Sequence, residues 1–376
     1  MAQTQLSNDI FDRPYLLLTP GPLSTTPTVR QAMGRDWCTW DADYNEGVVS
    51  DVRRRVELLA SPSRPDAVTS TLIQGSGTAA VEATVGSSVP TDGHLLVLAN
   101  GHYGQRIGRI AEILGIRSTD YDVGELGRFD PAVLRSIIVG DSSITHMAVV
   151  HCETTTGRLN DIAPLIEIAR AADLTVIVDA MSSFGGLPFD MIELGIDFLV
   201  TSANKCIQGV PGVGIVVALR GAMEACEGRA RSLSLDLFDQ WSTMEAQHGK
   251  WRFTSPTHVV RALHQALIEL DAEGGPEARL RRYGENHRLL VEGMSQLDFR
   301  MVLNAADASP FITSFYLPDD VSFEALHRSL KADGFVIYPG KVTDIRSFRI
   351  GTIGDVFPSD IQRLLHSIHR FQKDET

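Results

Sequence analysis

Three short segments hold residue types that could carry out chemistry together. Gly75-Ser76-Gly77-Thr78 opens an expected helix, where backbone N–H groups and hydroxyls could hold a phosphate. Asp179 ends one apolar run, and Lys205 follows another directly after Asn204. Ligands on α/β sheets bind at the carboxyl ends of strands, so this carboxylate and this amine are expected in one cleft. A phosphate cradle, a carboxylate and a lysine are the three groups that pyridoxal 5'-phosphate (PLP) requires.

PLP would give each of these groups a defined task. Lys205 would form a Schiff base with the cofactor and later carry a proton at the substrate carbon. Asp179 would pair with the protonated ring nitrogen and keep the ring an electron sink. Arg349 lies between apolar residues of an expected strand. Its planar guanidinium suits a carboxylate or phosphonate of the substrate.

Each residue also has a simpler explanation when it is taken alone. The glycine segment could be a turn with a helix cap, and it has neither the dinucleotide-binding spacing nor a Walker lysine. Asp179 could cap a loop, Lys205 could be a solvated surface lysine, and Arg349 could form a structural salt bridge. A non-catalytic α/β protein that binds some other phosphate ligand is therefore an alternative from a different class, although it leaves the pairing of Asp179 with Lys205 unexplained.

Composition excludes several classes of partner. The chain has 376 residues and a formal charge of -13, with 34 Lys and Arg against 47 Asp and Glu, which argues against nucleic acid. No apolar run reaches the length of a membrane span, and residues 1–11 do not read as a secretory signal. The four cysteines have no metal-ligand spacing, so we expect free thiols, no metal and a cytoplasmic location.

The elements that would position these residues follow an α/β pattern. Apolar runs of strand length alternate with amphipathic stretches, which favours a mostly parallel sheet buried on both faces. The expected strands are residues 67–74, 94–100, 117–123, 145–152, 175–181, 198–203 and 214–219. The expected helices among them include residues 78–87, 103–114, 162–172 and 191–194.

The strand rhythm stops near residue 258, where two long helical patterns flank Gly274-Gly275-Pro276. The expected elements that follow are residues 311–317, 323–332, 335–339, 348–353 and 359–371, which predict a small α+β domain. We therefore expect an N-terminal arm at residues 1–20, a large PLP-binding α/β domain at 21–265 and a small C-terminal domain at 266–376.

At this point the residues resemble a known family, the PLP-dependent aminotransferases of fold type I and class V. The segments that carry the resemblance are residues 18–22, 75–78, 100–106, 151–157, 178–179, 204–205 and 348–351. The resemblance implies a fold-type-I PLP transferase, with a mostly parallel seven-stranded sheet in the large domain and a smaller α+β domain. It also implies a homodimer that shares its active sites.

Within this family the sequence most resembles the phosphonate branch, through residues 36–45 and 204–212. That likeness implies transfer of the amino group of 2-aminoethylphosphonate to pyruvate, with phosphonoacetaldehyde and L-alanine as products. The alternatives within the family are an alanine or serine aminotransferase that uses glyoxylate or pyruvate, and a lyase or desulfurase. A desulfurase needs a mobile catalytic cysteine, whereas we expect Cys206 to serve packing.

The resemblance also assigns roles to individual residues. The cofactor-binding set that it implies, alongside Lys205 and Asp179, is Ser76, Gly77, Thr78, Tyr103, Thr154, Met181, Asn204 and Thr254. Ser76, Gly77 and Thr78 would hold the phosphate with Thr254 of the partner chain, Tyr103 and Met181 would cover the two ring faces, and Thr154 would reach the ring oxygen. Arg349 and Gly21 would bind the substrate. The roles of Trp37, Trp40 and Asp43 stay open between shaping the substrate entrance and packing.

Overall fold

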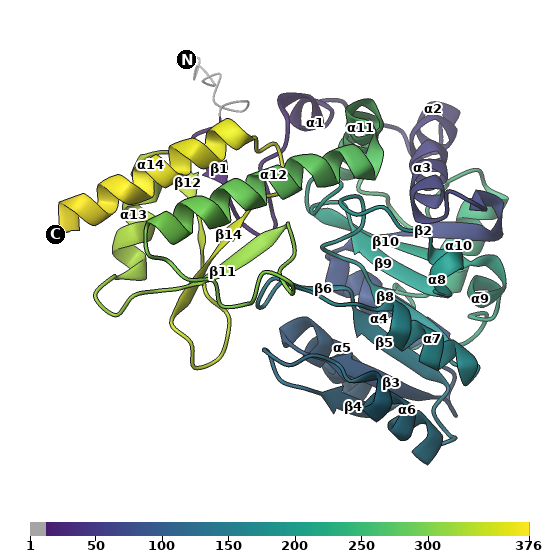
Figure 1. The fold of residues 1–376 in the computed structure, drawn as a ribbon. Coiled ribbons are helices and arrows are strands. Elements are labelled where there is room, and N and C mark those ends of the chain that lie inside the picture. The colour runs from purple at the N-terminus through teal and green to yellow at the C-terminus, as the bar shows by residue number, and fades with distance from the viewer. Residues whose placement is uncertain (1–12, 376) are drawn as a thin grey trace.

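The computed structural model describes residues 13–375 and has two parts (Figure 1). A large sheet with helices on both faces occupies one side of the molecule, and a smaller α+β unit formed mainly by the C-terminal third occupies the other. Residues 1–11, where the sequence reads as free of a secretory signal, lie outside the described residues.

The large sheet has seven strands in the order β2-β10-β9-β8-β5-β3-β4. Their bounds are β2 Val68–Gly75, β3 His94–Ala99, β4 Arg117–Asp122, β5 His146–Val150, β8 Thr175–Asp179, β9 Phe198–Ser202 and β10 Gly212–Leu219. Only β10 runs antiparallel to its neighbours. The predicted α/β class with a mostly parallel sheet is confirmed, and each expected strand is present with its ends shifted by at most two residues.

The central strands are apolar on both faces because helices cover both sides of the sheet. In β3, Leu96 and Leu98 join one core, whereas Leu95 and Val97 join the other. The helices on the first face are α3 Asp51–Ala60, α6 Pro131–Gly140, α7 Ala163–Ala171, α8 Met191–Leu194 and α11 Thr257–Glu273. Those on the second are α4 Gly77–Ser88, α5 His102–Ile113, α9 Arg220–Glu224 and α10 Leu237–Ala246.

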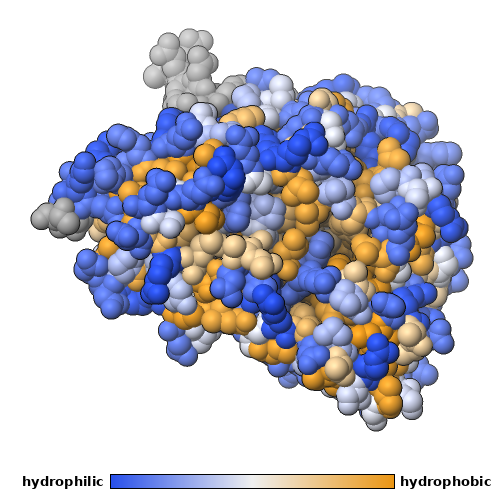
Figure 2. All heavy atoms as spheres, viewed as in Figure 1, coloured by the Kyte–Doolittle hydropathy of each residue, from blue (hydrophilic) through white to orange (hydrophobic). Residues whose placement is uncertain are grey.

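The smaller unit packs three helices on a short sheet. Helices α12 Gly275–Gln296, α13 Phe323–Ala332 and α14 Pro358–Glu375 accompany strands β11 Ile312–Tyr316, β13 Tyr338–Pro339 and β14 Ser347–Gly351. The sheet order is β11-β14-β13. On the face shown in Figure 2, hydrophilic residues predominate over α13 and α14, while apolar residues reach the surface mainly in the middle of the view.

The N-terminal segment belongs structurally to this smaller unit. Strand β1 Leu16–Leu17 pairs in parallel with β12 Phe335–Val336, and Leu18 lies in the same apolar core as Phe348. The division between the large and the small domain at residue 265, which the sequence led us to expect, remains a prediction, and that position lies inside α11.

The remaining elements are short and lie at the edges. They are α1 Pro27–Gln31, α2 Ala42–Tyr44, a π-helix at Asn45–Ser50, a 3-10 turn at Pro65–Ala67, and the two-residue strands β6 Cys152–Glu153 and β7 Arg158–Leu159. Within residues 13–375, no helix has the length and apolar character needed to span a bilayer.

Candidate active site

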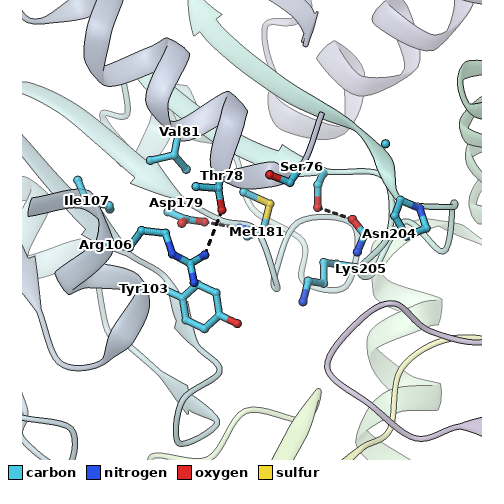
Figure 3. Close-up of a pocket in the computed structure, with 14 residues that line it drawn as sticks. Ser76, Thr78, Val81, Tyr103, Arg106, Ile107, Asp179, Met181, Asn204 and Lys205 are labelled. Atoms are coloured by element: carbon cyan, nitrogen blue, oxygen red, sulfur yellow. Dashed lines mark hydrogen bonds between the residues drawn. The ribbon is translucent and has the colours of Figure 1, made fainter. Parts of the chain in front are cut away.

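A pocket opens where β8 and β9 end and α4 begins (Figure 3). Fourteen residues line it: Ser76, Gly77, Thr78, Val81, Tyr103, Arg106, Ile107, Asp179, Met181, Ser202, Asn204, Lys205, Pro211 and Gly212. The parallel pairing of β8 with β9 places Asp179 opposite Val200, so the residues that follow both strands meet at one edge. The structure therefore brings the three predicted segments together.

The start of α4 faces the pocket with unused hydrogen-bonding groups. Ser76 is the N-cap residue, yet its side chain caps no N–H of this helix, and the first N–H groups of a helix have no partner within it. The hydroxyl of Thr78 accepts a hydrogen bond from Nη1 of Arg106 at 3.0 Å. A Cβ at Gly77 would clash with the sulfur of Met181, so a larger residue here would have to displace that side chain. The helix end can accept an anion such as a phosphate.

Asp179 is a buried carboxylate without a cationic partner. Its Oδ1 accepts the backbone N–H of Met181 at 2.9 Å, and no Lys, Arg or His among residues 13–375 lies within ion-pair distance of it. Burial raises the pKa of Asp179 to about 6. Burying a charged carboxylate costs free energy, and a ligand that brings a positive charge next to Asp179 would offset much of that cost.

Lys205 lies across the pocket from Asp179 and is 9% exposed. Its amine donates a hydrogen bond to the carbonyl of Pro20, and no carboxylate of residues 13–375 forms an ion pair with it. Burial lowers the pKa of Lys205 to about 8. Gly21 has a φ of +119°, and a Cβ there would lie 2.8 Å from the lysine Nζ. Gly21 therefore leaves room for the amine, which is the nucleophile of this pocket.

Arg349 contributes a second buried cation. Its Nη1 donates to the carbonyl of Thr154 at 2.9 Å and its Nε to the carbonyl of Pro339 at 3.1 Å. No carboxylate in the described part of the chain pairs with it, so the expected alternative of a structural salt bridge is not found there. Burial lowers the pKa of Arg349, and its charge in turn helps to lower the pKa of Lys205. This guanidinium is available for an anion near the lysine.

Tyr103 is held at the rim by the first turn of α5. The buried carboxylate of Glu153 accepts the backbone N–H groups of Tyr103 and Gly104 at 3.1 and 3.3 Å. Two cations lie near the tyrosine ring, with Cζ of Arg106 at 4.8 Å and Nζ of Lys341 at 4.7 Å from its centroid. The ring thus forms part of the pocket wall beside positive charge.

Other residues singled out by the sequence do not line the pocket. Thr254 is exposed, and Thr154 adjoins the site through its carbonyl contact with Arg349. Trp37 packs against Tyr44 with ring centroids 6.0 Å apart. Trp40 is 76% exposed. Asp43 forms an ion pair with Arg35 at 2.9 Å.

The buried Cys206 matches the expected packing role. Its thiol donates a hydrogen bond to the carbonyl of Ser182, and burial raises its pKa. A thiol that stays protonated is a poor nucleophile. The pocket residues absent from the sequence-based site are Val81, Arg106, Ile107, Ser202, Pro211 and Gly212. Arg106 could have been found, because it lies three residues after Tyr103 and thus on the same face of α5.

Comparison with known proteins identifies the family. The model of the family described as aminotransferase class-V matches residues 49–349, which is most of the chain. The chain belongs to this family. Class-V aminotransferases use PLP, so the predicted enzyme class and cofactor are confirmed.

Two curated relatives of this class-V aminotransferase are named 2-aminoethylphosphonate–pyruvate transaminase. The one from Syntrophobacter fumaroxidans is 57% identical over 366 residues, covering 96% of this chain and 98% of the relative. The one from Vibrio vulnificus strain CMCP6 is 55% identical over 358 residues, covering 95% and 97%. The crystal structure of pyridoxamine–pyruvate aminotransferase from Mesorhizobium loti superposes with a TM-score of 0.87 at 23% identity, over 97% of this chain and 93% of that one, and confirms the fold.

The pocket of this class-V aminotransferase fits PLP. The unused groups at Ser76 and the first turn of α4 suit the phosphate, and the unpaired carboxylate of Asp179 suits a protonated ring nitrogen. The side chains of Val81, Ile107 and Met181 offer apolar surface to a flat ring, and the Lys205 amine could form the covalent bond to the cofactor.

The depressed pKa of Lys205 predicts how the apoenzyme captures its cofactor. A lysine must be neutral to attack a carbonyl, and a pKa of about 8 leaves on the order of a tenth of Lys205 neutral at pH 7, far more than an ordinary lysine. The capture rate should therefore rise between about pH 6.5 and 8 and level off above about 8.5. Stopped-flow recording of the visible band after mixing apoenzyme with PLP measures it. A rate that keeps rising tenfold per pH unit up to about pH 10 would contradict the lowered pKa.

Proposed function

We propose that this enzyme moves the amino group of 2-aminoethylphosphonate to pyruvate, giving phosphonoacetaldehyde and L-alanine, as a step in phosphonate breakdown. The observation that carries this proposal is Arg349, a buried cation without a carboxylate partner among residues 13–375, whose charge helps to lower the pKa of Lys205. The relatives named for this reaction, at 55 and 57% identity over nearly the whole chain, support it.

The bound PLP supplies a carbonyl carbon that combines with the substrate amine and a ring that withdraws electrons from the substrate carbon. Ser76, Gly77 and Thr78 would hold its phosphate, with Thr254 of the partner chain, and Asn204 would flank the anchoring lysine. Tyr103 and Met181 would cover the ring faces, and Thr154 would lie beside the ring oxygen. Asp179 keeps the ring nitrogen protonated, because a buried carboxylate without a partner favours a cation.

Lys205 then acts as the proton carrier. With PLP bound, the Lys205 amine would accept a proton from the amine-bearing carbon of the substrate and release it again, which is the proton transfer that transamination requires. Its lowered pKa suits this work, since an amine with a pKa of about 8 can both accept and release a proton near neutral pH. Gly21 and the carbonyl of Pro20 hold the amine in place while it is free.

Arg349 would orient the substrate in both half-reactions. Its guanidinium, fixed by the carbonyls of Thr154 and Pro339, can bind the phosphonate of the donor and the carboxylate of pyruvate in turn. Since both substrates use one pocket, the enzyme alternates between them in a ping-pong sequence.

We also propose a homodimer that shares its active sites, located in the cytoplasm. The exposed Thr254 is followed by the buried Ser255 and preceded by Phe253, which is 55% exposed. Phe253 and the 76% exposed Trp40 offer apolar surface to a second copy. The unpaired cysteines Cys38, Cys152, Cys206 and Cys226 suit a reducing compartment.

Amine-donor profiling tests the proposed reaction. The purified holoenzyme receives 2-aminoethylphosphonate, L-alanine or L-serine without any keto acid, and the visible cofactor band is followed. Both 2-aminoethylphosphonate and L-alanine should bleach the band, and pyruvate should restore it. A band that responds to alanine and serine but not to the aminophosphonate would support an alanine or serine aminotransferase, with the cofactor residues unchanged.

A further inference from the structure

The loop between β13 and β14 carries a lysine to the rim of the pocket. The backbone carbonyl of Lys341 accepts a hydrogen bond from Nε2 of His102 at 3.2 Å, at the first residue of α5. Two residues later, Thr343 donates its backbone N–H to Glu125 at 2.6 Å and its hydroxyl at 3.1 Å. The loop is thus fastened to the large unit at Lys341 itself and again at Thr343, and this lysine has a defined position.

Lys341 does not itself line the pocket, and its amine has no acidic partner within ion-pair distance among residues 13–375. Its Nζ lies 4.7 Å from the centroid of Tyr103, which lines the pocket. Burial lowers the pKa of Lys341, the charges of Arg106 and Arg349 lower it further, and Glu153 and Glu125 oppose the shift. Lys341, Arg106 and Arg349 therefore gather around Tyr103, and such a group of cations is stabilised when an anion binds among them.

The two substrates of the proposed reaction differ in what they offer to this group. A carboxylate has one negative charge and two oxygens, which a single guanidinium can bind with both of its parallel N–H groups. A phosphonate has three oxygens in a tetrahedron and, like a phosphate monoester, carries more than one negative charge near pH 7. In 2-aminoethylphosphonate the phosphorus is also one carbon further from the amine-bearing carbon than the carboxylate of alanine is. One arginine leaves a phosphonate oxygen and part of its charge without a partner.

We propose that Lys341 determines the amine-donor specificity by binding the phosphonate group of the donor, and that it leaves the carboxylate of pyruvate or alanine to Arg349. This assignment rests on the proposed function. The assignment adds to that function a difference between the two substrates: Lys341 binds only the phosphonate, whereas Arg349 binds the carboxylate as well.

The test compares donors in the variant Lys341→Gln. The first half-reaction is followed by loss of the visible cofactor band with 2-aminoethylphosphonate, and separately with L-alanine. The kcat/KM for the aminophosphonate should fall about 10- to 100-fold, as expected for one charge-assisted contact, mainly through KM, while that for alanine changes less than about threefold. Lys341→Arg should restore most of the loss, because it keeps the charge.

Two other variants serve as references. Lys331→Gln, at an exposed position of α13, removes the same charge away from the pocket and should leave both donors unchanged. Arg349→Gln should impair both donors. Binding of ethylphosphonate and of propionate, which have no amine to react, is measured from the shift of the cofactor band and should show the same contrast in Lys341→Gln.

The outcomes separate this inference from the proposed function. If wild-type enzyme does not use 2-aminoethylphosphonate at all, the proposed function fails. If wild-type enzyme uses it and Lys341→Gln either leaves both donors unchanged or impairs both by the same factor, the reaction stands and the role of Lys341 is overturned.

Discussion

Replacing Lys205 with alanine is expected to lower the rate of alanine formation by on the order of 10⁴-fold or more. The variant loses the covalent anchor of the cofactor and the group that moves the proton at the substrate carbon. The protein should still fold, because removing a buried amine with a lowered pKa removes a cost of burial. Steady-state alanine formation and single-turnover bleaching of the cofactor band measure the two losses, and circular dichroism checks the fold.

The neighbouring residue supplies a matched control. Cys206→Ser changes the next residue in the chain, which is equally buried, and should keep activity within a few-fold because its thiol serves packing. Activity of Lys205→Ala above a tenth of wild type would refute the catalytic role of the lysine. A loss in Cys206→Ser as large as in Lys205→Ala would favour thiol chemistry instead.

The second large effect is expected in Asp179→Asn. This variant should lose activity, whereas its apoenzyme should be more stable than that of wild type. Without the carboxylate the ring nitrogen is no longer held protonated, and kcat should fall by about 10²- to 10³-fold, as for other fixed electrostatic contacts. Asn is nearly isosteric and its oxygen can still accept the N–H of Met181. The fall in activity would therefore report the charge and not a loss of packing.

The stability effect follows from the raised pKa of Asp179. The folded apoenzyme holds this proton up to about pH 6, whereas the unfolded chain releases it near 3.8, so the free energy of unfolding falls as pH rises between these values. The total is about 3 kcal/mol. Apo Asp179→Asn should therefore be more stable than apo wild type at pH 8 by up to about 3 kcal/mol, and by only about 1 kcal/mol at pH 4.5. Urea denaturation of both apo proteins at the two pH values measures their free energies of unfolding. If the variant and wild type differed by the same amount at both pH values, the raised pKa of Asp179 would be contradicted.

The large sheet was predictable because its signals are local. Strands such as β5 and β8 are continuous apolar runs, and Asp179 stands at the end of one of them. Helix α8 was also predicted with its bounds, since Asp190 caps its start and Gly195, with a φ of 79°, ends it. Helices α3, α6 and α10 were not named from the sequence, although Asp130 and Pro131 give α6 a local start signal. The π-helix at Asn45–Ser50 was not named either.

The site was predictable only where its residues share a strand end or a helix start. Ser76, Asp179 and Lys205 meet these conditions, and the structure brings them into one pocket. Lys341 does not, because it lies in an irregular loop of the smaller unit. Its position depends on contacts with His102 and with Glu125 through Thr343, which are far away in the sequence and leave no local pattern.

The pairing of β1 with β12 has a consequence for the order in which the chain is made. Leu16 is synthesised long before its partner Phe335, because the whole large sheet lies between them in the sequence. Pro20 and Gly21, which touch the Lys205 amine, follow β1 directly. The large sheet is complete once β10 has been synthesised, but the amine lacks its final surroundings until β12 emerges. A nascent chain that still lacks β12 therefore has an unfinished pocket around this amine.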